Sequence, residues 1–140
     1  MNFNLEHLPE RPNRPRQSGL TMVMDKGISL RQAEDLVSLS GECIDILKLG
    51  FGTSYLAPDL KKKVKLYRDA GMKVYVGGTL FEAFYIRGQL KDYVKMLKKF
   101  DIDTLEVSDG SMEIPHKLKC DLIHDLSKEF TVLSEVGSKE

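Results

Sequence analysis

Five short apolar runs in this chain each end in a cluster of glycine, hydroxyl and charged residues. These clusters occupy positions 24–27, 48–54, 77–79, 108–111 and 134–139. Lysine and hydroxyl side chains can bind anions, carboxylates can hold a metal ion, and glycines let backbone amides approach a phosphate or carboxylate group. The repeated pattern therefore predicts a rim of reactive groups along one edge of a sheet.

Three charged residues lie within the apolar runs. Because side chains alternate between the two faces of a strand, Lys48, Glu106 and Glu135 are expected to oppose the apolar residues beside them. With Asp25 and Lys26 they would form a mixed cluster of lysines and carboxylates that points away from the helices. Burying an unpaired charge is costly, so such a cluster either meets a charged ligand or metal, or forms an ion-pair network that fills a barrel.

Glycine and hydroxyl residues supply the uncharged part of the predicted rim. Their spacing matches neither GxGxxG nor the P-loop, so each segment taken alone would be an ordinary turn. Taken with the charged residues, they are candidates for contacts with a substrate anion. These candidates are Gly50, Gly52, Thr53, Gly77, Gly78 and Ser108.

Amphipathic helical segments separate the apolar runs. The spacing predicts strands at about 20–25, 44–50, 73–78, 104–109 and 131–136. Ser29 and Gln32 have the spacing of a capping box, Pro58 and Gly71 mark the two ends of the second helix, and Gly88 can break the third helix into two pieces. Alternating strands and helices predict a parallel sheet, in which ligands bind at the carboxyl ends of the strands.

Composition narrows the class of protein. The chain is 41% hydrophobic, 30% charged and formally neutral, which indicates a globular domain with no general attraction to nucleic acid. No apolar stretch approaches the roughly 18 residues that a membrane span needs. Cys43 and Cys120 are expected to be small buried thiols of a reducing compartment. We therefore expect a cytoplasmic protein that binds neither nucleic acid nor membrane.

Two further segments carry clustered charges. Residues 1–19 contain three prolines among three arginines, and we interpret them as an extended N-terminal arm that lies over the domain formed by residues 20–140. The alternative is that these arginines reach towards an anion. In the second helix, four lysines are expected on a solvated outer face: Lys61, Lys62, Lys63 and Lys65.

Five motifs in order, from about Arg14 onwards, closely resemble the phosphosulfolactate synthase family. They occupy positions 20–27, 45–54, 77–82, 106–110 and 133–139. The resemblance implies an α/β fold of the (β/α)8 TIM-barrel type. It also implies a lyase that adds sulfite to phosphoenolpyruvate with the help of Mg2+, giving phosphosulfolactate on a route to coenzyme M or related sulfonates.

The resemblance also implies roles for individual residues. The acid that protonates the intermediate is expected to be Lys139, with Lys48 as the second choice. Lys26 and Lys48 are candidates for binding the substrate anions. The expected metal ligands, directly or through water, are Glu106, Asp109, Glu135 and Asp25.

The length of the chain corresponds to about four and a half βα units of such a barrel. We therefore expect the isolated chain to expose sheet edges, to associate with further copies of itself or depend on a missing partner segment, and to have little synthase activity. An alternative is a non-catalytic relative of the same fold, or a truncated fragment, that serves as a binding or structural protein.

A doubly wound receiver domain also has five parallel strands in a chain of this length. Asp25, Ser108 and Lys139 fit that signalling module superficially. Its phosphoacceptor aspartate should follow the third strand, where this chain has Gly77 and Gly78. The order of the strands separates the two folds, since neighbours run 1-2-3-4-5 in a barrel and 2-1-3-4-5 in a receiver domain.

Overall fold

Five strands and six α-helices alternate along the chain in a computed structural model that describes residue 3 and residues 5–137. The strands are β1 (Met22–Asp25), β2 (Ile46–Leu49), β3 (Lys73–Val76), β4 (Thr104–Val107) and β5 (Thr131–Ser134). The helices are α1 (Leu30–Ser40), α2 (Thr53–Leu56), α3 (Leu60–Asp69), α4 (Gly78–Tyr85), α5 (Leu90–Lys99) and α6 (His116–Leu126), and a 3-10 turn, η1 (Gly41–Cys43), follows α1.

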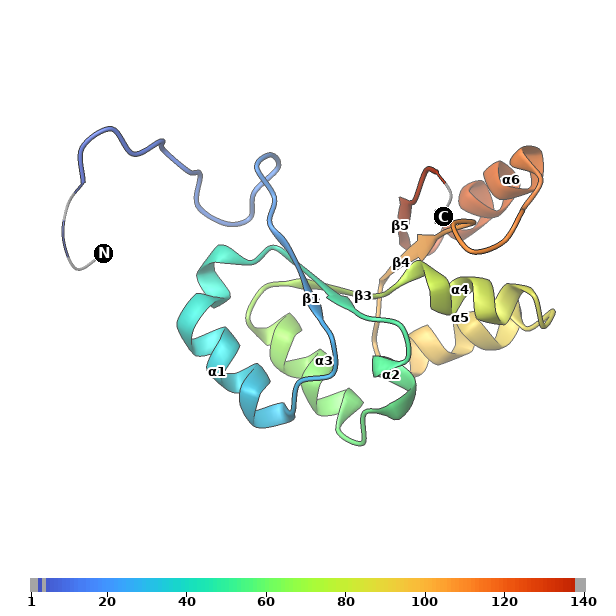
Figure 1. Cartoon of the computed structure of the whole chain (residues 1–140), viewed down its shortest axis with the longest axis horizontal. Helices are drawn as coiled ribbons and strands as arrows, with labels where there is room; N and C mark the ends of the chain where they lie inside the picture. The colour runs from blue at the N-terminus through green and yellow to red at the C-terminus, as the bar shows by residue number, and fades with distance from the viewer. Residues whose placement is uncertain (1–2, 4, 138–140) are drawn as a thin grey trace.

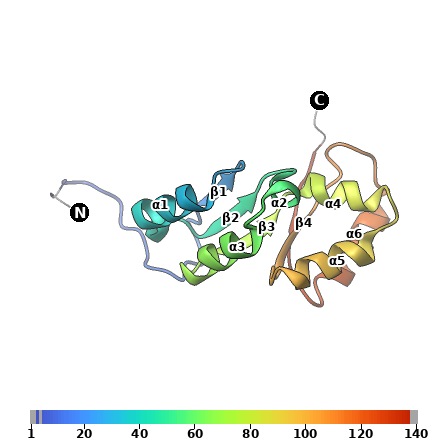
Figure 2. The ribbon, with the colours of Figure 1, turned by 90° about the horizontal axis from the view of Figure 1, so that it is seen from below.

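The strands form one parallel sheet in the order β1-β2-β3-β4-β5. Sequential neighbours are the arrangement of a barrel, so the receiver-domain alternative is excluded and the predicted TIM-barrel type of fold is confirmed as a partial barrel. The helices follow one another around the outer side of the curved sheet, from α1 at one end to α6 at the other (Figures 1 and 2).

Local signals in the sequence explain where several helices begin and end. Ser29 and Gln32 form the predicted capping box, each side chain accepting a hydrogen bond from the other residue's backbone amide. Gly71 takes a left-handed conformation after α3, and Gly88 does so in the break between α4 and α5. The short helix α2, which begins at Thr53, was not predicted.

The core lies between the sheet and the outer helices. Leu47 and Leu49 of β2 and Leu105 and Val107 of β4 are completely buried, which confirms the predicted alternation of the two faces. The residues of opposite parity, among them Lys48, therefore point to the inner face of the curved sheet. This inner face and the carboxyl ends of the strands are where a barrel of this type carries its site.

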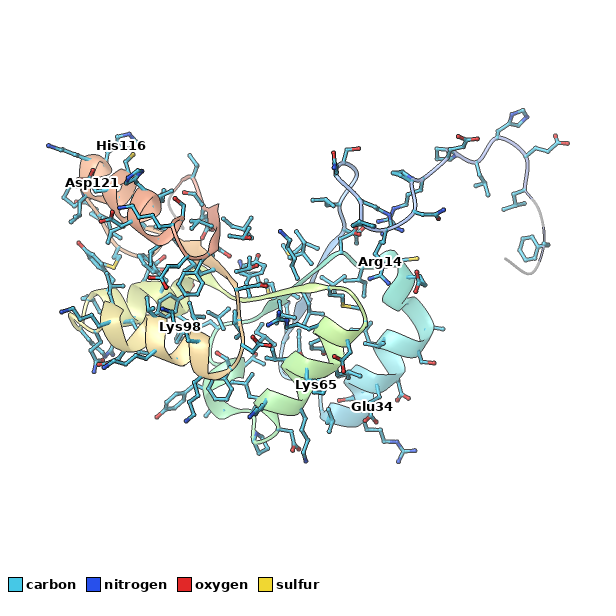
Figure 3. All side chains as sticks on the ribbon, turned by 180° about the vertical axis from the view of Figure 1, so that it is seen from behind. Arg14, Glu34, Lys65, Lys98, His116 and Asp121 are labelled. Carbon is cyan, nitrogen blue, oxygen red and sulfur yellow. The ribbon has the colours of Figure 1, made fainter. Side chains whose placement is uncertain are left out.

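The N-terminal arm is bound to the amino-terminal end of the sheet through the carboxylate of Asp45, which directly precedes β2. Arg16 Nη1 donates to Asp45 Oδ1 at 2.7 Å and Arg11 Nη2 donates to Asp45 Oδ2 at 3.3 Å. Arg14 lies beside the end of α1 nearest the arm and donates to backbone carbonyls (Figure 3). The Thr21 amide and the Arg16 guanidinium hold the pKa of Asp45 below its usual range. The arginines thus bind an anion, but it belongs to the protein itself.

Two expectations about burial are wrong. Cys43, in the 3-10 turn after α1, and Cys120, in α6, are both exposed. Lys63 is only 2% exposed. It shares the buried stripe of α3, since it lies three residues after Leu60 and four before Tyr67.

No helix within the described residues is both long enough and apolar enough to cross a membrane.

Candidate active site

An ion pair lies at the centre of the inner face. Lys48 Nζ is 2.8 Å from Glu106 Oε2, and the two side chains are only 18% and 6% exposed. The ammonium group also lies 5.6 Å from the centre of the Tyr75 ring. Burial and the nearby Glu106 carboxylate raise the pKa of Tyr75, so its hydroxyl stays protonated. The structure thus places a lysine of β2, a phenol of β3 and a carboxylate of β4 side by side.

Two further carboxylates converge on a buried hydroxyl at the end of β4. The Ser108 Oγ atom is 2.5 Å from Glu82 Oε1 and 2.8 Å from Glu135 Oε2. Glu82 Oε2 also accepts a hydrogen bond from the Ser111 amide at 3.1 Å. Glu82 comes from α4, whereas Glu135 follows β5, so this contact joins the ends of three βα units.

The glycine pair after β3 makes room for these side chains. A Cβ atom at Gly78 would lie 2.4 Å from Ser108 Cβ and 2.9 Å from Glu106 Oε1, and one at Gly77 would lie 3.0 Å from Lys48 Cε. The close approach that the sequence suggested for a substrate anion is therefore already used by the protein's own side chains.

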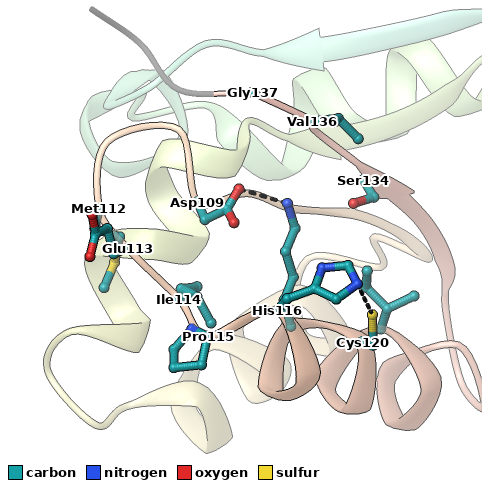
Figure 4. Close-up of a pocket in the computed structure, with 12 residues that line it drawn as sticks. Asp109, Met112, Glu113, Ile114, Pro115, His116, Cys120, Ser134, Val136 and Gly137 are labelled. Carbon is teal, nitrogen blue, oxygen red and sulfur yellow. Dashed lines mark hydrogen bonds and ion pairs between the residues drawn. The ribbon is translucent and has the colours of Figure 1, made fainter.

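Asp109 lies at the edge of this region beside α6. Its Oδ1 accepts a hydrogen bond from Lys119 Nζ at 2.6 Å, and the same ammonium donates to the backbone oxygen of Glu135. Figure 4 shows this pair in a cavity of about 670 Å3 between α6 and the ends of β4 and β5. His116 and Cys120 line the same cavity, with His116 Nε2 3.6 Å from Cys120 Sγ. The Asp109 carboxylate is thus already paired with a cation.

Asp25 was expected to point to the inner face of the sheet, but it points to the side of the helices. Its neighbour in the register is Leu49, whose side chain faces the helices, and Asp25 is 2% exposed. The carboxylate accepts bonds from Lys63 and Tyr67 of α3 and from two backbone amides. Its oxygen atoms are thus already occupied by four donors, which leaves Asp25 poorly suited to hold a metal ion.

The remaining candidates lie around a second cavity, of about 470 Å3, between the loops that follow β1 and β2. Lys26, Gly52 and Thr53 line it, and Lys26 is exposed. Gly52 has φ of 78°, and the Gly50 amide donates to the backbone oxygen of Asp25 at 2.8 Å. Lys26, which follows β1, and Lys48, near the end of β2, thus lie at neighbouring strand ends.

Lys139 lies outside the described residues, so its role stays a prediction. Within residues 3 and 5–137, no group of three or more His, Cys, Asp and Glu side chains is arranged to hold a metal ion. Mg2+, however, commonly takes only one or two protein carboxylates and completes its shell with water and substrate oxygens. Glu82 and Glu135, which meet at Ser108, are the pair of carboxylates that comes nearest to that smaller requirement, although both oxygen atoms of Glu82 already accept hydrogen bonds.

Sequence reasoning missed three residues of this region. Glu82 is a lone charge in an otherwise apolar helix, which was a usable signal. Lys63 had a signal in its place on the stripe of α3. Lys119 gave no signal in the sequence, because it is one of several charged or polar residues in α6. It reaches Asp109 only because α6 packs on β4 and β5.

A profile of the (2R)-phospho-3-sulfolactate synthase (ComA) family matches residues 9–140, which include every strand and helix described above. The chain belongs to this family. The resemblance seen in the five motifs is therefore confirmed.

Individual members of the family are similar over almost the whole chain. The phosphosulfolactate synthase of Methanothermobacter thermautotrophicus is 40% identical over 135 residues, covering 94% of this chain and 52% of that protein. The Bacillus subtilis protein of the same name is 36% identical, covering 99% and 54%, and that of Methanocaldococcus jannaschii is 39% identical, covering 88% and 50%. The chain spans about half the length of these relatives.

Proposed function

We propose that this chain forms part of the active site of a carbon–sulfur lyase that adds sulfite to phosphoenolpyruvate, giving (2R)-phospho-3-sulfolactate. The observation that carries the proposal is the family match over residues 9–140. It is supported by the cluster of lysines and carboxylates at the carboxyl ends of the strands, where barrels of this type carry their chemistry.

The proposed reaction forms one carbon–sulfur bond and one carbon–hydrogen bond. The sulfur lone pair attacks the methylene carbon of phosphoenolpyruvate, and the electrons of the double bond move to the adjacent carbon and into its carboxylate. The resulting dianion takes a proton at that carbon, and the phosphate ester stays intact. Both substrates are anions, so the site must offset repulsion as they meet.

Lys48 can offset part of that repulsion, since Glu106 neutralises the rest of its charge. Its ammonium is held by Glu106 at 2.8 Å and by the Tyr75 ring, so its position is set before a substrate arrives. Lys26 is exposed at the end of β1 and can contribute a second cation. We keep Lys139 as the proposed proton donor and Lys48 as the second choice.

Mg2+ is the proposed cofactor. Glu82 and Glu135 would hold it near Ser108, with Glu106 available to its water shell, and Asp109 is less suited because Lys119 already neutralises it. When bound, the ion would stabilise the negative charge that develops on the substrate carboxylate. Ser108 lies between the two carboxylates and can donate its hydroxyl proton to either one of them.

The test is incubation of a full-length version of the protein with sulfite, phosphoenolpyruvate and Mg2+, followed by mass spectrometry of the product. We expect phosphosulfolactate from the parent protein and a large loss of rate in Lys139→Ala and Lys48→Met. Lys65→Met, which removes an exposed lysine paired with Asp69 on α3, is the matched control and should retain the parent rate.

Each result has a separate meaning. Absence of product from the parent protein at any Mg2+ concentration would reject the synthase assignment and favour a relative that has kept the fold without the chemistry. An active Lys139→Ala variant would reject only the role of that residue as acid.

We also propose that the reaction takes place in the cytoplasm, on a route to coenzyme M or related sulfonates.

A further inference from the structure

A buried polar cluster, formed by Asp25, Lys63 and Tyr67, lies behind the first strand end on the side of the helices. The three residues are 2%, 2% and 0% exposed. Lys63 Nζ is 2.5 Å from Asp25 Oδ2, and the Tyr67 hydroxyl donates to the same oxygen at 2.9 Å. None of the three points to the inner face, so the cluster is separate from the proposed reaction centre.

The other oxygen of Asp25 holds the loop that follows β1. Asp25 Oδ1 accepts hydrogen bonds from the Gly27 amide at 2.8 Å and the Ile28 amide at 3.0 Å. Lys63 Nζ also donates to the Ile28 backbone oxygen at 2.7 Å. The loop is therefore bound at both its amides and its carbonyl by one buried carboxylate and one buried ammonium.

The same residue reaches the neighbouring loop through its backbone. The Asp25 carbonyl oxygen accepts a hydrogen bond from the Gly50 amide at 2.8 Å and a long one from Thr53 Oγ1 at 3.5 Å. The loops after β1 and β2 are the two walls of the 470 Å3 cavity, and Lys26 and Lys63 both line it. The shape of that cavity thus depends on the bonds around Asp25.

A hydrophobic residue in place of Lys63 or Tyr67 would fill the space between α3 and β1 at lower electrostatic cost. Helix packing alone therefore does not account for a buried ion pair at this position. The hydrogen bonds of Asp25 give the ion pair another role, because they fix the backbone on both sides of Lys26. We propose that Lys63 and Tyr67 are positioning residues that act through Asp25 to present Lys26 to an anionic substrate, an inference that rests on the proposed synthase function.

The first arm of the test measures the loop itself in the 140-residue chain. Tyr67→Phe removes one hydroxyl donor to Asp25. Tyr93→Phe is the matched control, because Tyr93 is also completely buried and its hydroxyl has no hydrogen-bond partner among the described residues. We expect hydrogen exchange of the Gly27 and Ile28 amides to accelerate about tenfold in Tyr67→Phe and to stay unchanged in Tyr93→Phe. Equal exchange in the two variants overturns the inference.

The second arm is a double-mutant cycle in the active protein. Tyr67→Phe should raise the KM for phosphoenolpyruvate or sulfite about fivefold with kcat little changed, and it should have no further effect in a Lys26→Ala background. A purely structural role would lower the amount of folded protein without changing KM. Additive effects of the two substitutions therefore overturn the inference.

A third variant is included in case the KM change in Tyr67→Phe is too small to measure. Lys63→Met leaves the Asp25 carboxylate buried without its cation, and we expect a larger KM change than in Tyr67→Phe if enough protein folds. If the parent protein forms no product, the synthase proposal fails, and the exchange arm still decides whether Tyr67 holds the loop through Asp25.

Discussion

Replacing Gly78 by alanine tests how closely the ends of β3 and β4 approach one another. The added Cβ atom would lie 2.4 Å from Ser108 Cβ and 2.9 Å from Glu106 Oε1. Because carbon atoms in contact are normally at least about 3.5 Å apart, one side of this contact must move by about 1 Å. Both neighbours are buried and bonded, Ser108 to two carboxylates and Glu106 to Lys48, so neither can move without weakening those bonds.

The magnitude follows from two opposing effects. Overpacking of this kind costs about 1–3 kcal/mol. Alanine is favoured over glycine in a helix by up to about 1 kcal/mol, although Gly78 is at the first position of α4, where the gain is smaller. We therefore expect Gly78→Ala to lower the free energy of unfolding by about 1–2 kcal/mol, and the Tm by roughly 3–6 °C.

The assay is urea unfolding followed by circular dichroism, with two comparison variants. Gly77→Ala should cost less, because its Cβ atom meets Lys48 Cε at 3.0 Å and that flexible side chain can shift. Ser108→Gly removes the atom that Gly78→Ala would strike, so the double variant should lose less stability than the two single changes added together. A Gly78→Ala protein as stable as the parent, or strictly additive effects, would refute the argument from close packing.

Three further predictions concern groups outside this contact. Burial raises the pKa of Asp25, but hydrogen bonds from Lys63 and the loop amides outweigh burial and bring the pKa below its usual value. Asp25→Asn should therefore be less stable than the parent at pH 7 in urea unfolding, and the difference should shrink as the pH falls below about 4, where the unfolded carboxyl takes up its proton. Asp45→Ala should free the arm, so that trypsin cuts after Arg16 much faster than in the parent, as mass spectrometry would show; equal rates would contradict the arm contacts. Cys43 and Cys120 should both react with Ellman's reagent in the native protein, whereas protection of either thiol would contradict its exposure.

Most elements of the fold could be predicted because their signals are local. The capping box at Ser29, the glycines after α3 and between α4 and α5, and the alternation in β2 and β4 depend on neighbours along the chain. Alternation also predicted that Lys48 and Glu106 would share a face, and their 2.8 Å contact agrees with this. Asp25 was added to that face from its place at the end of the first strand, whereas its register with Leu49 puts it on the side of the helices.

The candidate site was only partly predictable for the same reason. Charged residues within strands could be found from their alternation, but Glu82 and Lys119 come from helices, where a polar residue is ordinarily solvated. Only the packing of α4 and α6 on the sheet brings them to Ser108 and Asp109. The metal and substrate roles of these groups stay predictions.

The sequence by itself determined the alternating parallel architecture, the family and the strand ends that carry charge. It could do so because periodicity, turn chemistry and motifs are properties of adjacent residues. The tertiary structure alone decided which charges meet. Asp25 and Tyr67 are 42 positions apart and come together only when α3 packs on β1, which turns a presumed metal ligand into the centre of a buried cluster. A buried charge is stabilised by the partners within about 3 Å of it, and that distance is fixed by the fold.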